Sequence, residues 1–292
     1  MSSAPRALAC PDSLKAVLSA RDAAAALASG FAAAGVDCDE LPLADGGEGT
    51  ADALAGRVGD AAVIEAAQVI PFDPARLDVM VHSSRPLGEA LARVRAPRLI
   101  VGLGGTANMD AGAGLLDVLA ELPAPTTVLC DVQTTLYDAP RTFGPQKGAT
   151  PEQAVELEQR FRADERLAPF AYLPGAGAAG GLGAALASLG AELVPGAPAV
   201  LELVGFAPRG YDVVVSGEGR VDATTAVGKA PGEVARRCAA AGVQCVVFGG
   251  VVAEPLPEPT ETVSLSGDRA RARDDLVELG RRLGLRLLDA SR

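Results

Sequence analysis

Only three of the 26 lysine and arginine residues of this chain are lysines. Each lysine lies in a short segment that contains glycine or proline: Lys15 in 11–15, Lys147 in 144–148 and Lys229 in 227–231. An ammonium is a compact point charge and a guanidinium is a broad planar fork, so a retained lysine suggests a site that handles phosphate. A lysine in such a loop also has little packing to lose. The alternative is that composition bias left three solvated lysines near loops.

Two acidic segments rich in glycine could hold a metal ion. The first supplies Asp45 and Glu48 among three glycines, and the second supplies Glu218 and Arg220. Phosphoryl transfer needs Mg²⁺ held by carboxylates, phosphate oxygens neutralised by lysine or arginine, and an aspartate that accepts the hydroxyl proton. Each segment alone could equally be a tight turn, but together they favour this chemistry.

Two longer glycine-rich segments follow. Residues 102–112 contain the only asparagine, Asn108, and residues 174–183 contain a G-x-G-x-x-G pattern that includes Gly177 and Gly180. The second segment could cradle phosphate on backbone amides at a helix N-terminus, or it could be a close-packed turn. The residues before it make a poor strand, so NAD binding is not favoured.

The elements that must position these residues are short apolar strands alternating with alanine-rich helices, the pattern of α/β units with a largely parallel sheet. Strands are expected at 7–10, 38–44, 62–66, 77–82, 98–103, 126–130, 211–216 and 243–248. Helices are expected from the cap Ser19 to Ala34, with Gly35 as the stop, and over 268–288. Polar or glycine-bearing segments follow six of the strands, at the sheet edge where ligands bind in open α/β folds.

Charge and cysteine content exclude several classes of protein. The chain has 37 acidic and 26 basic residues, and its net charge of −11 opposes nonspecific binding to nucleic acid or to an anionic membrane. No apolar run approaches the length of a membrane span, and the N-terminal stretch lacks an uncharged apolar region. Five cysteines without a C-x-x-C pair suggest neither a disulfide framework nor a zinc site. We expect a cytoplasmic protein with a small-molecule substrate, and the sequence leaves open whether the protein forms a homodimer.

Taken in order along the chain, these segments resemble the type 1 glycerate kinases, ATP-dependent enzymes that phosphorylate D-glycerate. The matching segments are 9–15, 43–50, 102–114, 130–132, 143–149, 174–183 and 216–222, the last continuing to 228–229. They extend over most of the chain and contain all three lysines.

The resemblance implies ATP and Mg²⁺ as co-substrate and cofactor. The expected catalytic residues are Asp131, Lys15, Asp45 and Lys147, with Asp131 or Asp45 as base or metal ligand and the lysines, with Arg220, stabilising the transferred phosphate. The residues expected to bind substrate or nucleotide are Asp12, Ser13, Gly46, Gly47, Glu48, Gly104, Gly105, Thr106, Asn108, Asp110, Gly177, Gly180, Glu218 and Arg220. The expected Mg²⁺ ligands are Asp45, Asp131 and Glu218.

The chain departs from the family pattern at several positions. After Lys15, Ala16 and Val17 stand where the family usually has a small Gly-Ser type pair. Met109 replaces an asparagine, and Ala111 replaces a glycine. Gln133 begins a stretch that replaces Thr-Asn-Pro. The chain is also shorter than typical members, with apparent deletions near 59–63 and 116–126, which would trim the second domain around the substrate.

We therefore predict an α/β protein with a Rossmann-like three-layer domain formed by residues 1–58 and 206–292. A second, shortened α/β domain is inserted over 59–205, and a cleft between the two holds the active site. The predicted function is ATP-dependent phosphorylation of D-glycerate, to 2-phosphoglycerate by the resemblance, or of a related small hydroxy acid. The alternative is a non-catalytic glycerate-kinase-like sensor, favoured by Met109 and Gln133, and a hydride-transfer enzyme comes third.

Overall fold

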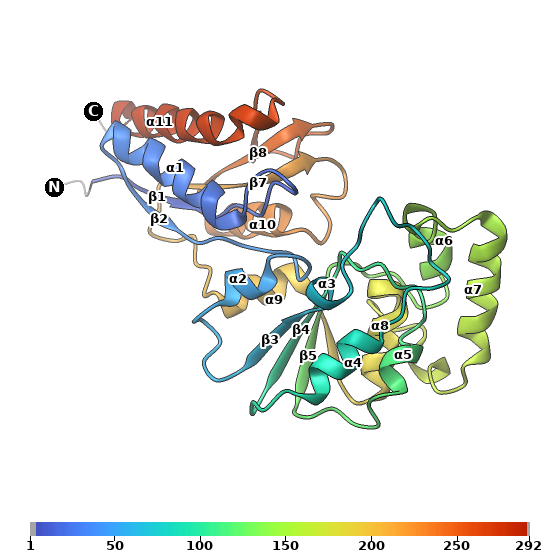
Figure 1. Cartoon of the computed structure of the whole chain (residues 1–292). Coiled ribbons are helices and arrows are strands. Elements are labelled where there is room, and N and C mark those ends of the chain that lie inside the picture. Colours follow the sequence, from blue (N-terminus) through green and yellow to red (C-terminus); the bar gives the residue numbers. More distant parts are fainter. Residues whose placement is uncertain (1–3, 291–292) are drawn as a thin grey trace. The chain divides into compact units, whose positions relative to one another are not determined.

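The computed structural model describes residues 4–290 and divides into two compact units. Unit 1 comprises the residues up to Ala44 and those from Val200 onward, and unit 2 is Asp45–Ala199. Each unit contains its own parallel sheet, so the predicted α/β class is confirmed (Figure 1). The domain junctions predicted from the sequence lie at 58/59 and 205/206, and residues 200–205 belong to unit 1 in the structure. In the structure residues 45–58 group with unit 2, because helix α2 (Thr50–Leu54) packs against strand β3 (Ala62–Glu65).

The sheet of unit 1 has five parallel strands in the order β2-β1-β7-β8-β9. Their bounds are β1 Arg6–Ala9, β2 Asp37–Glu40, β7 Val213–Val221, β8 Gln244–Val252 and β9 Glu261–Ser264. Strands β7 and β8 run further than the sequence predicted, with Glu218 beside Gly249 and Arg220 beside Val251. The segment that contains Glu218 and Arg220 is therefore strand and not a strand exit.

Helices cover both faces of this sheet. Helix α1 (Ala20–Ala34) begins and ends as predicted, since the Ser19 side chain accepts from Asp22 N and Gly35 is left-handed with φ of 83°. In Figure 1 α1 lies beside α11 (Ala272–Ala290), and helix α10 (Ala230–Ala241) lies on the other side of the sheet. A Cβ on Gly30 would overlap the carbonyl oxygen of Val277, so α1 and α11 touch backbone to backbone.

The sheet of unit 2 has four parallel strands in the order β3-β4-β5-β6. Strands β4 (Leu99–Leu103) and β5 (Thr126–Cys130) are central and match the prediction, while β6 (Glu192–Pro195) was not predicted. The predicted strand at 77–82 is wrong. There Asp78 Oδ1 accepts from Met80 N at 3.0 Å, which makes a turn, and Val79 is buried in a hydrophobic core.

Two hydrophobic cores organise the helices of unit 2. The first lies on one face of the sheet and includes side chains of α3 (Ala66–Val69), α4 (Arg85–Ala92), α5 (Ala113–Leu116) and α8 (Ala178–Ser188). The second includes residues of α6 (Ala139–Phe143) and α7 (Pro151–Ala163), together with Met109. The remaining elements are α9 (Gly196–Leu203) and the 3-10 turns η1 (Pro145–Lys147), η2 (Ala168–Phe170) and η3 (Arg269–Arg271). No helix in residues 4–290 is both long enough and apolar enough to cross a membrane.

Candidate active site

The carboxylates of Asp45 and Asp131 border the same pair of glycines in unit 2. Asp131 directly follows β5, and Asp45 begins the turn that leads to α2. A Cβ on Gly47 would lie 3.3 Å from Asp45 Oδ1 and 3.9 Å from Asp131 Oδ2. A Cβ on Gly104 would lie only 2.6 Å from Asp131 Oδ2 and 2.9 Å from the Cα of Gly47. Glycine at these positions therefore lets the turn after Asp45 pack against the exit of β4, with both carboxylates within 4 Å of the Cβ position of Gly47.

The turn that carries Asp45 is held by hydrogen bonds at both ends. Asp45 Oδ1 accepts from Gly47 N at 3.2 Å, and Thr50 Oγ1 donates to the Gly47 carbonyl at 2.7 Å. Glu65, which is 3% exposed at the end of β3, accepts from Ala51 N at 2.5 Å. Sequence reasoning did not select Glu65, although its place at a strand end was a usable signal. Its carboxylate lies at the first turn of α2, where negative charge is favourable.

Two further predicted residues of this turn differ in exposure. Gly46 is buried with φ of 99°, and a Cβ there would lie 2.9 Å from the Cα of Gly196 and 3.1 Å from the Cβ of Leu129. Gly46 is therefore a packing position. Glu48 is exposed on the same turn. Of the two acids in this segment, Asp45 is the one whose carboxylate borders Gly47 together with that of Asp131.

Lys147 is buried in unit 2 with its ammonium near the acidic residues. It ends the 3-10 turn η1, is 6% exposed, and donates from Nζ to the Asn108 carbonyl at 2.9 Å. Burial lowers the pKa of Lys147 to about 8, and the negative charges of Asp131 and Asp110 oppose that fall. The expectation that a loop lysine has little packing to lose is therefore wrong at Lys147.

The loop after β4 brings a set of predicted residues to the same region. Gly104 is buried and Gly105 is exposed with φ of 64°. Thr106 and Asn108 are 2% and 0% exposed, and their Oγ1 and Oδ1 atoms have no hydrogen-bond partner among the described residues. Asp110 is half-buried, and its carboxylate accepts hydrogen bonds from within the unit. This loop supplies both the wall beside Asp131 and the carbonyl that holds Lys147.

The second glycine-rich segment is a close-packed turn. The residues from Ala179 to Gly181 are left-handed in succession, with φ of 49°, 68° and 95°. A Cβ on either Gly177 or Gly180 would overlap a carbonyl oxygen, that of Asn108 in the case of Gly180. Both glycines are buried by protein atoms. These contacts support the close-packing alternative at Gly177 and Gly180 over a phosphate cradle.

Unit 1 contains a separate polar cluster around Glu218. Glu218 is 9% exposed and accepts from Thr225 Oγ1 and from Lys229 Nζ, each at 2.8 Å. The charge of Glu218 is thus balanced by Lys229 inside its own unit, which makes it a weaker candidate for a Mg²⁺ ligand than Asp45 or Asp131. Thr225 and Lys229 were not among the expected site residues, although Lys229 was singled out by its residue type.

The other predicted residues of unit 1 lie at or near the strand ends. Asp12 is buried, donates from its backbone N to the Gly217 carbonyl at 2.9 Å, and accepts from Ser13 N at 2.6 Å. Lys15 is exposed. Arg220 is exposed and pairs with Asp222 at 3.2 Å, and a surface pair of this kind contributes little to stability.

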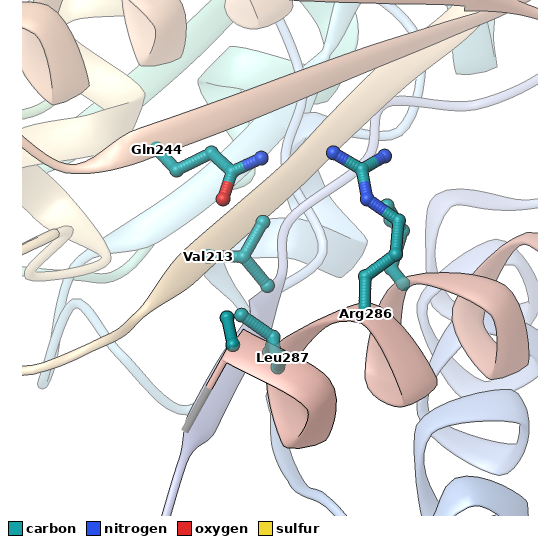
Figure 2. Close-up of a pocket in the computed structure, with 6 residues that line it drawn as sticks. Val213, Gln244, Arg286 and Leu287 are labelled. Carbon is teal, nitrogen blue, oxygen red and sulfur yellow. The ribbon is translucent and has the colours of Figure 1, made fainter. Parts of the chain in front are cut away.

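A hollow of about 150 Å³ lies at the opposite edge of the same sheet, beside the first residues of β7 and β8. Figure 2 shows Gln244 and Arg286 at this hollow, with Val213 and Leu287 below them. Arg286 is paired with Glu261 at 2.9 Å. The guanidinium of Arg286 is already neutralised by Glu261, and the hollow lies beside the first residues of β7 and β8, away from the carboxyl ends of the strands. The hollow is therefore not the candidate site.

Three of the departures from the family pattern, Met109, Ala111 and Ala16, differ in their structural setting. Met109 is fully buried in the second core of unit 2, so this position serves packing. Ala111 keeps a left-handed backbone with φ of 52°, and Ala16 does the same with φ of 58°. An alanine there costs roughly 1–2 kcal/mol that a glycine would avoid.

The described residues offer few side chains that could bind a metal ion together. Within residues 4–290, no three His, Cys, Asp or Glu side chains gather in a way that could hold a metal. Two carboxylates do meet, those of Asp45 and Asp131. Mg²⁺ is commonly bound by one or two carboxylates together with substrate phosphates, so this pair fits Mg²⁺ delivered with a nucleotide.

Comparison with known proteins gives one consistent result. The sequence model of the glycerate kinase family matches residues 7–122 and 120–265. The chain is 33% identical over 322 aligned positions to glycerate kinase of Bacillus subtilis, with 83% of this chain and 84% of the relative covered. It is 31% identical to glycerate 2-kinase of Escherichia coli, with 76% and 78% covered.

A solved structure agrees with these relatives. The crystal structure of a provisionally assigned glycerate kinase 2 from Salmonella typhimurium LT2 superimposes with a TM-score of 0.81 at 26% identity. The alignment covers 99% of this chain and 100% of that chain.

Proposed function

Because the chain belongs to the glycerate kinase family and is a kinase that acts on an alcohol group, we propose that it transfers the terminal phosphate of ATP to D-glycerate. We propose Mg²⁺ as the cofactor and 2-phosphoglycerate as the product, the latter suggested by a relative named glycerate 2-kinase. The observation that carries the proposal is the meeting of two carboxylates and a buried ammonium in unit 2.

Lys147 is the proposed stabiliser of the transferred phosphate. Its ammonium sits near Asp131 in a site from which water is largely excluded, since Lys147 is 6% exposed. A fixed charge in such surroundings stabilises developing negative charge more strongly than it does in water. With a pKa of about 8, the Lys147 ammonium is charged at neutral pH and can act in this way.

Asp131 is the proposed base. Its carboxylate would take the proton of the glycerate hydroxyl as the hydroxyl oxygen bonds to the γ-phosphorus. The bond from that phosphorus to the bridging oxygen breaks, and ADP leaves with the electron pair. Asp45 is the second carboxylate at the same glycines and is the alternative base.

Mg²⁺, when bound, would neutralise charge on the phosphate oxygens, with Asp45 or Asp131 as the protein ligand. Asp45 is already oriented by the Gly47 amide, so its free oxygen has a fixed direction. The residues of unit 1, chiefly Lys15, Arg220 and the Glu218 cluster, stay candidates for phosphate contact. A cytoplasmic location also stays our prediction.

The test is ADP release by purified protein given ATP and Mg²⁺, with and without D-glycerate, followed by ³¹P NMR of the product. The proposal expects ADP release only with glycerate, loss of activity with EDTA, and a 2-phosphoglycerate signal. A 3-phosphoglycerate signal would overturn the product assignment. Binding of glycerate by calorimetry without ADP release would favour the sensor alternative instead.

A further inference from the structure

Protein groups of unit 2 hold the Lys147 ammonium in place, and their importance for catalysis rests on the function proposed for Lys147. Lys147 Nζ donates to the backbone carbonyl of Asn108 at 2.9 Å, across 39 residues of sequence. The loop that carries Lys147 is a single 3-10 turn. The Asn108 carbonyl therefore accepts a hydrogen bond that helps to fix the ammonium, beside the attraction of Asp131 and Asp110.

The side chain of Asn108 is committed to fixing its own backbone. It is 0% exposed, and its Nδ2 donates to Asp110 Oδ1 at 3.1 Å and to the Ala179 carbonyl at 3.0 Å. Both amide protons are thus used by protein acceptors on two different segments. Its Oδ1, which has no hydrogen-bond partner among the described residues, is also buried, so the side chain presents no exposed atom to a substrate.

Asp110 anchors the first of these bonds. Its carboxylate accepts five hydrogen bonds, from Ser84 N, Ser84 Oγ, Asn108 Nδ2, Gly112 N and Gly114 N. Each carboxylate oxygen offers about two lone-pair directions, so five donors saturate the two oxygens of Asp110. Asp110 is held rigidly and in turn holds the Asn108 amide.

The left-handed turn at Ala179–Gly181 anchors the second bond and shapes the space around the carbonyl. The Ala179 carbonyl accepts from Asn108, and the Gly180 carbonyl accepts from Ala111 N at 3.0 Å. A Cβ on Gly180 would overlap the Asn108 carbonyl oxygen itself. The absence of a side chain at Gly180 therefore leaves that oxygen free to accept from Lys147.

We infer that Asn108 is a positioning residue of the kinase, whose buried amide fixes the backbone carbonyl that holds the Lys147 ammonium. It acts through Lys147 and does not contact the substrate. This assigns Asn108 a different role from the ligand contact expected from the sequence.

The main test variant is Asn108→Ala, with Met109→Leu as the matched control in the same loop. Met109 is fully buried in a hydrophobic core, and a volume-conserving change there is tolerated. Asn108→Ala should lower kcat on the order of 10²-fold, as a misplacement of about 1 Å can do, while KM for glycerate stays within a few-fold. Met109→Leu should leave both constants near those of the wild type.

A double-mutant cycle separates positioning from direct contact. If Asn108 acts through Lys147, adding Asn108→Ala to Lys147→Ala changes kcat no further. A full additional loss, or a rise in KM as the main effect, would show that Asn108 touches the substrate and would overturn the inference.

A second readout does not depend on activity. The chain has only three lysines, so ¹³C-lysine labelling gives few signals, and the one lost in Lys147→Ala belongs to Lys147. That signal should shift in Asn108→Ala and stay in Met109→Leu; an unshifted signal would overturn the inference. Asn108→Ser, whose hydroxyl can donate one of the two bonds, replaces the alanine variant if that variant does not fold. Wild-type protein without glycerate-dependent ADP release would count against the proposed function alone, because the NMR arm still decides the positioning role.

Discussion

Replacing Lys147 by methionine should remove a charge that the folded protein holds at a cost. Burial lowers the pKa of Lys147 from 10.5 to about 8, and at ~1.4 kcal/mol per pKa unit this is on the order of 3 kcal/mol against folding at neutral pH. The folded pKa lies below the unfolded one, so between the two values the unfolded chain binds more protons. Wild-type stability should therefore rise with pH through this window, by about 2 kcal/mol between pH 7 and about pH 9.5, relative to the methionine variant.

The measurement is urea unfolding of wild type and Lys147→Met at both pH values. Tyrosine fluorescence in a Tyr211→Phe background reports unit 2 alone, since the other tyrosines, Tyr137 and Tyr172, belong to that unit. The difference between the two proteins cancels groups that titrate in both. The change of this difference with pH also removes the constant cost of leaving the Asn108 carbonyl unpaired in the variant. A stability difference independent of pH would refute the buried ammonium.

Three further outcomes are expected. Asp131→Asn should lower turnover by roughly 10² to 10⁴-fold in steady-state assays while ATP binding changes little, and near-normal turnover would move the base to Asp45. Gly104→Ala places a Cβ 2.6 Å from Asp131 Oδ2, so kcat should fall sharply with circular dichroism unchanged; normal kcat would show that the carboxylate has room to move. Ala111→Gly should raise the free energy of unfolding by about 0.5–1 kcal/mol, because relief at φ of 52° exceeds the added chain entropy, and a lower urea midpoint would contradict this.

Local signals explain which elements the sequence predicted well. Helix α1 was placed to the residue because Ser19 and Gly35 carry their own boundary chemistry. Strands β6 and β9 were missed, and each has only four residues and lies at a sheet edge. Strand β6 in addition pairs with β5, a strand distant in sequence, with Thr127 opposite Glu192. The run 77–82 is apolar enough for a strand, yet it forms a turn in which the Asp78 side chain accepts a hydrogen bond from Met80 N. Pattern alone could not decide between these outcomes.

The site follows the same division. Asp45 and Asp131 were both selected from the sequence because each follows a predicted strand. Their approach could not be predicted in this way, because Asp45 follows β2 of the unit 1 sheet and Asp131 follows β5 of the unit 2 sheet. The burial of Lys147 could not be predicted either, because its partner is a backbone carbonyl, and any residue type supplies one. The Glu218 pair with Lys229 depends on how β7 continues past its predicted end.

The backbone contact between α1 and α11 has a consequence for biosynthesis. Gly30 and Val277 are brought together by the fold although about 250 residues separate them along the chain. A ribosome adds about 5–20 residues per second, so the first helix emerges roughly 10 to 50 seconds before its partner exists. During that interval the whole of unit 2 is synthesised as one continuous stretch, while the face of α1 that packs on α11 waits for its partner. Unit 1 can therefore complete its fold only after all of unit 2 has been synthesised.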